Sequence, residues 1–428
     1  MWWKESVFYQ IYPLGFCGAE RVNDFGETRH RLGEIEKEIG RLKELGIKAV
    51  LFNPFLQSDA HGYDTADFFS VDCRLGTNDE FAALTAKFHA SGIKVVADGV
   101  FNHVGMQFPE FKALKEKRTS DKLDYFHAHF GGDGNLYYEG WEGHNELARL
   151  NLSNTSVRGF LFDAVRFWID KFDIDGLRLD VAYMLPEDFM RELSGVVREK
   201  KADFFIVGEA IHGDYNRLLG CGADSVTNYE CYKGIHSAIN SKNLFEIEHS
   251  LSRQFADTAW ALYKGRHLFG FVENHDVPRI CTVLSDKQNT AAAYAILFAM
   301  PGIPCIYYGG EYGAQGGKGD ADIHLRPPMK DIDRNANGDL YERIKNLVAL
   351  RNARKSLQYG SYRKLTLANE FFSFMRECDG EKTVLGVNIS DSEKTVDIGG
   401  EACDLANGEK ASGSACIAPH SYRLFDVK

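Results

Sequence analysis

The feature that most constrains the fold is an alternation of short apolar runs with longer amphipathic stretches through the first two-thirds of the chain. Short apolar runs bounded by turn residues are typical of buried strands, whereas the stretches between them have the apolar spacing of helices. The expected strands are 7–11, 49–52, 94–99, 176–179, 204–208, 268–272 and 305–308. The expected helices include 32–45, 78–90, 156–171, 188–200 and 289–298. Repeated strand–helix units predict a parallel sheet, and the alternation alone allows either an open doubly wound sheet or a closed barrel.

The alternation is interrupted twice. Between Asn102 and Asn151 the sequence becomes irregular and rich in Gly and Tyr, which predicts an insertion after the third strand. After Ala353, short alternating runs separated by Gly- and Asp-rich turns predict a small antiparallel module. We therefore expect barrel segments at 1–103 and 151–354, an inserted domain at 104–150 and a C-terminal β domain at 355–428.

Composition limits the class of protein. The chain has 428 residues, 44% of them hydrophobic and 26% charged, as in globular proteins, and a formal net charge of -11. Such an acidic balance argues against nucleic acid and anionic membranes as partners. The N-terminal sequence lacks the pattern of a signal peptide, and the nine cysteines contain no CxxC pair. We expect a cytoplasmic protein with reduced thiols.

Four segments place ionisable side chains directly after an apolar run, at 98–103, 176–182, 207–210 and 271–276. In a parallel barrel the carboxyl ends of the strands meet at one mouth, where catalytic groups gather from several strands. The spacing therefore predicts one site assembled from strand ends.

The residue types suit cleavage of a glycosidic bond. This reaction needs one carboxylate as nucleophile or base and one carboxyl group as proton donor. Arg178 lies two residues before Asp180, on the same side of a strand, and would keep that carboxylate ionised as a nucleophile requires. Glu209 follows an apolar run with no basic residue beside it, a setting that favours the protonated form of a general acid. Asp276, beside His275, could bind sugar hydroxyls and balance the positive charge that develops on the sugar during cleavage.

Together these segments resemble the conserved regions of the α-amylase family of glycoside hydrolases, over a stretch from Val7 to about Met329. The resemblance implies an α/β fold: a (β/α)8 TIM barrel with an insertion after strand three and a C-terminal antiparallel β domain. It also implies Asp180 as nucleophile, Glu209 as acid/base and Asp276 as transition-state stabiliser. The supporting or substrate-binding residues that it implies are Asp98, Asn102, His103, Arg178 and His275.

Further residues resemble the subgroup of cyclomaltodextrinases, neopullulanases and maltogenic amylases. By this resemblance Tyr63, in a segment that includes Asp64, would stack on the sugar that is cleaved. Asp322 and Arg326 would hold the non-reducing terminal hydroxyls. Trp141 is interpreted either as a sugar platform or as part of the insertion's own core. The subgroup usually carries an N-terminal β domain, whereas this sequence begins at the first expected strand, so we expect a monomer and leave the oligomeric state open.

The expected activity is retaining hydrolysis of α-1,4 bonds, and in part α-1,6 bonds, in maltooligosaccharides or cyclodextrins through a glycosyl-Asp180 intermediate. The alternatives are an exo-acting α-glucosidase or oligo-1,6-glucosidase, a 4-α-glucanotransferase, and an inactive barrel used as a binding subunit. No cofactor is expected. A calcium loop at 331–339 is the open alternative, although the twelfth position counted from Asp333 is Ile344 rather than the Glu of an EF-hand.

Overall fold

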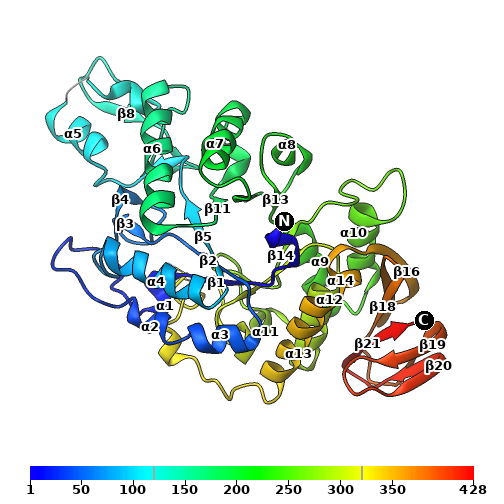
Figure 1. Cartoon of the computed structure of the whole chain (residues 1–428). Helices are drawn as coiled ribbons and strands as arrows, with labels where there is room; N and C mark the ends of the chain where they lie inside the picture. The colour runs from blue at the N-terminus through cyan, green and yellow to red at the C-terminus, as the bar shows by residue number, and fades with distance from the viewer. Residues whose placement is uncertain (119–120, 320–321) are drawn as a thin grey trace. The chain divides into compact units, whose positions relative to one another are not determined.

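A parallel sheet of eight strands forms the centre of the fold, as the computed structural model of residues 1–118, 121–319 and 322–428 shows (Figure 1). Its strands follow the order β13-β12-β11-β5-β2-β1-β15-β14. An isolated parallel bridge joins Thr227, after β13, to Phe269 in β14, so the sheet is nearly closed into a barrel. The strands are β1 (Phe8–Ile11), β2 (Ala49–Phe52), β5 (Lys94–Gly99), β11 (Gly176–Leu179), β12 (Phe205–Gly208), β13 (Ser225–Val226), β14 (Phe269–Gly270) and β15 (Ile303–Tyr307).

The barrel strands are buried on both faces, since all four residues of each of the strands β1, β2, β11 and β12 are buried. Strands covered on both faces read as continuous apolar runs, which explains why the sequence located them. The predicted barrel is confirmed, and so is the C-terminal antiparallel domain. Of the eight barrel strands, the one that the sequence missed is β13, whose two residues are too few to form a recognisable apolar run.

Two compact units divide the chain: Met1–Gln10, Glu44–Ala49 and Thr227–Lys428 form unit 1, and Ile11–Lys43 with Val50–Val226 form unit 2. The helices of unit 2 that follow its strands are α4 (Asn78–Ala90), α6 (Thr155–Phe172) and α7 (Glu187–Lys200). A capping box starts α4: Thr77 accepts from the backbone of Glu80, and Glu80 accepts in return from the backbone of Thr77. The expected helix 32–45 is instead two pieces, α2 (Gly33–Glu36) and α3 (Ile39–Leu45), and α3 ends before Gly46 at φ 87° as predicted.

The inserted segment of unit 2 contains short antiparallel pieces (Figure 1, cyan). These are the strands β6 (His103–Val104), β7 (Ala128–Phe130), β8 (Leu136–Tyr138), β9 (Gly140–Trp141) and β10 (His144–Arg149). The segment also contains the helix α5 (Pro109–Lys117). The pairing of β10 with β6 places Arg149 opposite His103. The insertion is therefore hydrogen-bonded to the segment that follows β5.

Unit 1 ends in a six-stranded antiparallel sheet of order β16-β17-β18-β21-β19-β20 (Figure 1, orange to red). Its strands are β16 (Ser361–Ala368), β17 (Phe371–Cys378), β18 (Glu381–Asn388), β19 (Lys394–Asp404), β20 (Lys410–Ile417) and β21 (Ser421–Val427). The helices of this unit include α9 (Tyr229–Asn240), α10 (Phe245–Phe255), α12 (Thr290–Ala299), α13 (Leu340–Ala353) and α14 (Lys355–Tyr359). Every residue of α12 is buried, and this helix packs against β18 and β21.

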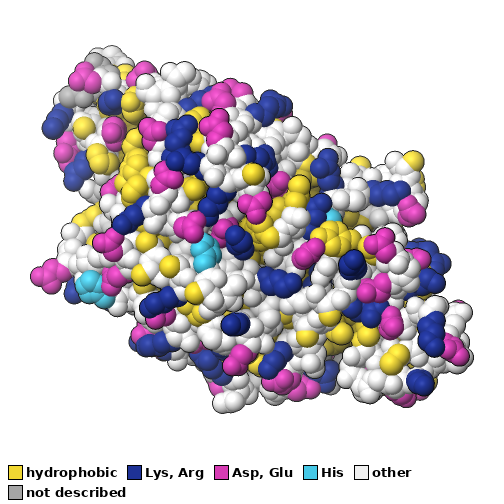
Figure 2. Space-filling model, in the orientation of Figure 1, with side chains coloured by type: hydrophobic (Ala, Val, Ile, Leu, Met, Phe, Trp, Pro, Cys, Tyr) yellow, Lys and Arg dark blue, Asp and Glu magenta, His cyan; other side chains and the backbone are white. Residues whose placement is uncertain are grey.

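The surface mixes charges of both signs: acidic and basic side chains alternate across the face that Figure 2 draws. None of the helices in the described ranges combines the length and the apolar character needed to cross a bilayer.

Candidate active site

Arg178 holds three carboxylates together in unit 2. Parallel pairing of β11 with β5 sets Arg178 directly opposite Asp98, so both side chains point to the same side of the sheet. Arg178 Nη1 lies 2.8 Å from Asp98 Oδ1 and 2.9 Å from Asp180 Oδ1. Its Nη2 lies 2.7 Å from Glu209 Oε1. One guanidinium thus contacts the two carboxylates that the sequence predicted as nucleophile and acid/base.

The two carboxylates come from adjacent strand ends. The backbone N–H of Asp180 donates to Gly99 and that of Glu209 donates to Leu179, which extends the ladder of the sheet by one residue on each strand. Asp180 is 5% exposed and Glu209 is 6% exposed. The chain turns sharply after Asp180, at Val181 with φ 48°, and the N–H of Val181 donates to Glu209 Oε2 at 2.9 Å. Their closeness is therefore set by strand register together with a tight turn.

Glu209 does not have the purely apolar setting that its local sequence suggested. The strand before it is apolar, but Arg178 comes from the neighbouring strand and contacts it directly. The prediction from local sequence was wrong on this point because it did not include a cation brought in by strand pairing.

Neighbouring negative groups keep Arg178 cationic despite its burial. The surrounding negative groups, first Asp98 and then Glu209, outweigh the opposing effect of burial and raise the pKa of Arg178 well above its usual value. Asp98 is held in turn by Tyr63, whose hydroxyl donates to Asp98 Oδ2 at 3.0 Å, and by the Asn53 amide at 3.1 Å. Sequence reasoning missed Asn53, which is the polar residue immediately after an apolar strand.

His103 and Trp141 line the same part of unit 2. His103 Nε2 lies 3.9 Å from Asp180 Oδ2, and the Asn102 amide lies 3.2 Å from His103 Nδ1. The Trp141 ring stacks on His144 with centroids 5.4 Å apart and lies 5.8 Å from the ring of His103. Within the described ranges, His103 Nε2 and Trp141 Nε1 are buried without a hydrogen-bond partner. Burial is also the main reason that the pKa of His103 falls to about 3, so its ring is neutral at ordinary pH.

Asp64 has a more local role than its neighbour Tyr63. Its carboxylate accepts from the backbone N–H of His61 at 3.1 Å and lies 3.7 Å from the ring of that residue. These contacts fix the turn that carries Tyr63. Tyr63, Asp64, Asp98, Asn102, His103, Trp141, Arg178, Asp180 and Glu209 thus all belong to unit 2.

The remaining predicted site residues belong to unit 1 and form a second cluster. His275 is 1% exposed, and its Nδ1 lies 3.0 Å from Gln10 Nε2. Asp276 lies 2.9 Å from His275 Nε2 and accepts at 2.9 Å from Arg326. Arg326 also donates to the carbonyl of His275 and lies 3.8 Å from Asp322. The structure therefore gathers His275, Asp276, Asp322 and Arg326.

A buried ion pair fixes the loop that carries Asp276. Glu273 accepts from Arg279 Nη1 at 2.9 Å and from the backbone of Ile280 at 2.6 Å. Burial raises the pKa of Glu273 despite this contact. Sequence reasoning missed Gln10, Glu273 and Arg279. The signal that could have indicated them is a polar residue within an otherwise apolar run. Among the residues with a described placement, no group of three or more His, Cys, Asp or Glu side chains could hold a metal ion.

Comparison with known proteins agrees with this geometry. The sequence model described as "Alpha amylase, catalytic domain" matches residues 10–358. A cyclomaltodextrinase of Geobacillus thermopakistaniensis is 29% identical over 100% of this chain and 78% of its own length. An intracellular maltogenic amylase of Bacillus subtilis is 29% identical over 94% of this chain and 73% of its own.

Solved structures show the same relationship. The ligand-free cyclic α-maltosyl-(1→6)-maltose hydrolase of Arthrobacter globiformis superposes with a TM-score of 0.85 at 26% identity, and each chain is covered completely. With the family match over most of the sequence, the chain belongs to the α-amylase family of glycoside hydrolases.

Proposed function

We propose that this enzyme is a retaining α-glycoside hydrolase that cleaves α-1,4 bonds, and α-1,6 bonds as a second class, in maltooligosaccharides or cyclodextrins. The observation that carries the proposal is the contact of one buried guanidinium, Arg178, with both Asp180 and Glu209. A retaining mechanism needs two carboxyl groups close together at one glycosidic bond. The family, and relatives named cyclomaltodextrinase and maltogenic amylase, support the substrate class.

In the proposed reaction, Asp180 attacks the anomeric carbon while the bond from that carbon to the leaving oxygen breaks. Glu209 gives its proton to the leaving oxygen and later takes one from the water that releases the sugar from Asp180. His103 Nε2 and Trp141 Nε1 are buried nitrogen atoms that sugar hydroxyls would satisfy. The role of Asp276 as transition-state stabiliser stays a prediction, tested by the loss of turnover in Asp276→Asn.

The test is a time course of products from maltotriose, maltoheptaose, β-cyclodextrin and cyclic α-maltosyl-(1→6)-maltose. We expect the wild type to release maltose and to open at least one of the rings, whereas Asp180→Ala should be inactive. The matched control is Asp163→Ala, which removes an exposed carboxylate of α6 that pairs with Arg166. More than a few per cent residual activity in Asp180→Ala would exclude Asp180 as nucleophile.

Glu209→Gln separates proton donation from the rest of the reaction. An aryl α-maltoside with an acidic phenol needs little protonation, so this variant should cleave it far better than maltotriose. Equal impairment on both substrates would contradict the assignment.

The alternative activities give different products. An exo-acting α-glucosidase or oligo-1,6-glucosidase would release glucose first and leave the rings intact. A 4-α-glucanotransferase would convert maltotriose into longer chains, and a binding subunit would produce nothing from any substrate. We also propose a cytoplasmic, monomeric enzyme; the location is supported by the intracellular relative from Bacillus subtilis and is tested by cell fractionation.

A further inference from the structure

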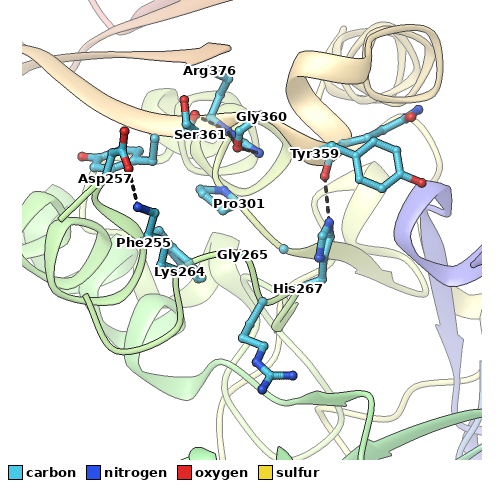
Figure 3. A pocket seen from close by; sticks show the side chains of 14 residues that line it. Phe255, Asp257, Lys264, Gly265, His267, Pro301, Tyr359, Gly360, Ser361 and Arg376 are labelled. Carbon is cyan, nitrogen blue, oxygen red and sulfur yellow. Dashed lines mark hydrogen bonds and ion pairs between the residues drawn. The ribbon is translucent and has the colours of Figure 1, made fainter. Parts of the chain in front are cut away.

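A cavity of about 230 Å³ lies in unit 1 between the loop before β14, the turn before β15 and the start of β16. Its lining includes Lys264, Arg266, His267, Gly302, Ser361 and Arg376 (Figure 3). The residues 265–267 precede β14, whereas Asn274 and Asp276 follow it. The cavity is therefore at the opposite end of this strand from His275 and Asp276, and it is independent of the function proposed above.

Two arginines beside the cavity are buried without a carboxylate. Arg351 and Arg376 are each 1% exposed, and neither forms an ion pair within the described ranges. All their recorded hydrogen bonds go to backbone carbonyls. Arg376 donates to Ala299, Gly360 and Ser361, while Arg351 donates to carbonyls at the end of α12. Burial lowers the pKa of Arg351 to about 9, and burial together with the charge of Arg351 lowers the pKa of Arg376 well below its usual value. An Arg side chain nevertheless stays protonated in proteins, so both positive charges persist inside the unit.

The backbone compensates these charges only in part. Ala299 ends α12 and Gly360 follows α14, and a helix C-terminus carries about half a negative charge. Two such ends supply at most about one negative charge against two guanidiniums. A buried charge that is not balanced destabilises the folded chain. A negatively charged ligand in the cavity would balance the remaining positive charge of the two guanidinium groups.

The other groups around the cavity are also mainly basic. Lys264 pairs with Asp257 at the surface, at 2.5 Å, and Arg266 is exposed beside it. Burial, followed by the positive charges of Lys4 and Arg351, lowers the pKa of His267 to about 3. Figure 3 shows the Asp257–Lys264 pair on the left of the cavity, His267 and Tyr359 on the right, and Arg376 at the top between these two sides. The charged side chains that line the cavity are Asp257, Lys264, Arg266 and Arg376, so their net charge is positive.

Arg376 has donors left for a ligand. Its hydrogen bonds use Nε and one N–H on each terminal nitrogen, so a second N–H remains on Nη1 and on Nη2. A cavity of about 230 Å³ is smaller than the roughly 300–1,000 Å³ of pockets for drug-sized ligands. It therefore suits a small ion or a single sugar unit, and it is too small for an oligosaccharide.

We propose that this cavity binds a phosphate-type oxyanion, with Arg376 at its base and Lys264 and Arg266 at its rim. Free inorganic phosphate and the phosphoryl group of a small sugar phosphate share the required chemistry. Guanidinium groups bind such oxygens through charge-assisted hydrogen bonds. The bound anion would tie the β14 side of unit 1 to β16 and β17 and stabilise the folded chain.

The test is thermal unfolding and titration calorimetry of the full-length chain with inorganic phosphate, at ionic strength held constant with chloride. We expect a saturable rise in Tm and binding of one phosphate per chain. Because replacing Arg376 would also remove helix-capping hydrogen bonds, the main variant is the exposed rim pair Lys264→Gln/Arg266→Gln. Loss of two charged contacts should weaken binding at least about tenfold. The matched control, Lys233→Gln/Lys410→Gln, removes the same charge at exposed positions of unit 1 and should bind phosphate normally.

Two results would overturn the proposal. One is the absence of saturable stabilisation by phosphate. The other is equal weakening in the rim and control variants, which would show general charge screening. A parallel titration with glucose 6-phosphate identifies the source of the anion: tighter binding than inorganic phosphate assigns a sugar phosphate, and equal or weaker binding assigns the free ion.

Discussion

Arg178 is the residue on which the geometry of the unit 2 cluster depends most. It is buried, it contacts Asp98, Asp180 and Glu209, and its aromatic neighbour Tyr63 lies 5.8 Å away. Three carboxyl groups at one strand edge would repel one another without this cation. The role of Arg178 is thus to allow two reactive carboxylates to share one buried site.

Replacing Arg178 by Met should therefore affect both stability and activity. Removing one partner from a buried ionic cluster costs about 3–5 kcal/mol. Without Arg178, the carboxylates of Asp180 and Glu209 should move from their reactive positions, which should lower kcat by about 100-fold or more. Urea unfolding and maltotriose hydrolysis measure the two effects. Arg166→Met, at an exposed pair on α6, is the control and should change neither by much. Near wild-type activity in Arg178→Met would contradict the assigned role.

One buried histidine, His103, and one half-buried histidine, His267, predict a loss of stability in acid. The pKa values of His103 and His267 are lowered to about 3 from the ordinary 6.5, mainly by burial. As the pH falls, each of these histidines takes up a proton near pH 6.5 in the unfolded chain. In the folded chain it does so only near pH 3. Each histidine should therefore lower the free energy of unfolding by about 1.4 kcal/mol per pH unit as the pH falls through this window.

The measurement is denaturant unfolding at several pH values between 7.5 and 4 for the wild type and His267→Gln. In the variant the free energy of unfolding should fall less steeply as the pH decreases, and the difference in slope should correspond to at most one bound proton. His30→Gln, at a surface pair with Glu80, serves as the control. Equal pH dependence in the wild type and His267→Gln would show that His267 takes up its proton at the same pH in the folded and the unfolded chain.

At the scale of elements, a side-chain contact links the insertion to the turn after β11. The Tyr183 hydroxyl donates to Glu142 Oε1 at 2.9 Å, and Glu142 occupies the tight turn between β9 and β10 at φ 45°. Arg217 holds the backbone of Tyr183 from the other side, at 2.7 Å. Because Tyr183 is also within electrostatic range of Glu209 and Asp180, this link borders the two carboxylates.

Tyr183→Phe should loosen the β9–β10 turn without unfolding the unit. One hydrogen bond to a charged group contributes about 1.5–3 kcal/mol when buried, and less at this half-exposed position. Hydrogen exchange of peptides covering 139–147 should be faster in Tyr183→Phe than in the wild type. Glu142→Gln keeps an acceptor for the hydroxyl and should protect the turn more than Tyr183→Phe does. Unchanged exchange in both variants would mean that the turn is held by other contacts.

Elements with strong patterns were predicted closely, whereas weak ones were not. The expected helix 78–90 and strands 94–99 and 176–179 coincide with α4, β5 and β11. The expected strand 268–272 is longer than β14, because Phe271 and Val272 are buried without belonging to a strand. Apolar character reports burial, and a buried loop beside a site has the same composition as a strand. The division into barrel segments, insertion and C-terminal domain at the expected boundaries stays a prediction.

On the scale of the whole chain, the C-terminal sheet completes the packing of unit 1. Helix α12 is buried along its entire length and packs against β18 and β21, and Arg376 of β17 donates to its last residue, Ala299. A helix that is apolar on all sides needs cover on all sides.

A chain truncated after Gly360 should therefore fail to fold as a soluble protein, since it exposes one side of α12. Soluble yield and near-UV circular dichroism compare it with the full chain. Removal of Lys428 alone, at an exposed terminal ion pair, is the control and should be tolerated. A soluble truncated chain with native near-UV signal would show that the sheet is dispensable for the fold of unit 1.

The sequence by itself determined the strand–helix alternation, the family and the chemical groups at the strand ends, because burial and local geometry leave periodic and positional patterns. It indicated Asp180, Glu209 and Asp276 through their places after apolar runs. Only the tertiary structure decided which groups touch: that Arg178 reaches Glu209 as well as Asp180, that Gln10 meets His275, and that Arg376 lies buried beside a cavity. These contacts join residues distant in sequence or on neighbouring strands. Their electrostatic effect depends on distances set by register and packing, which no local pattern records.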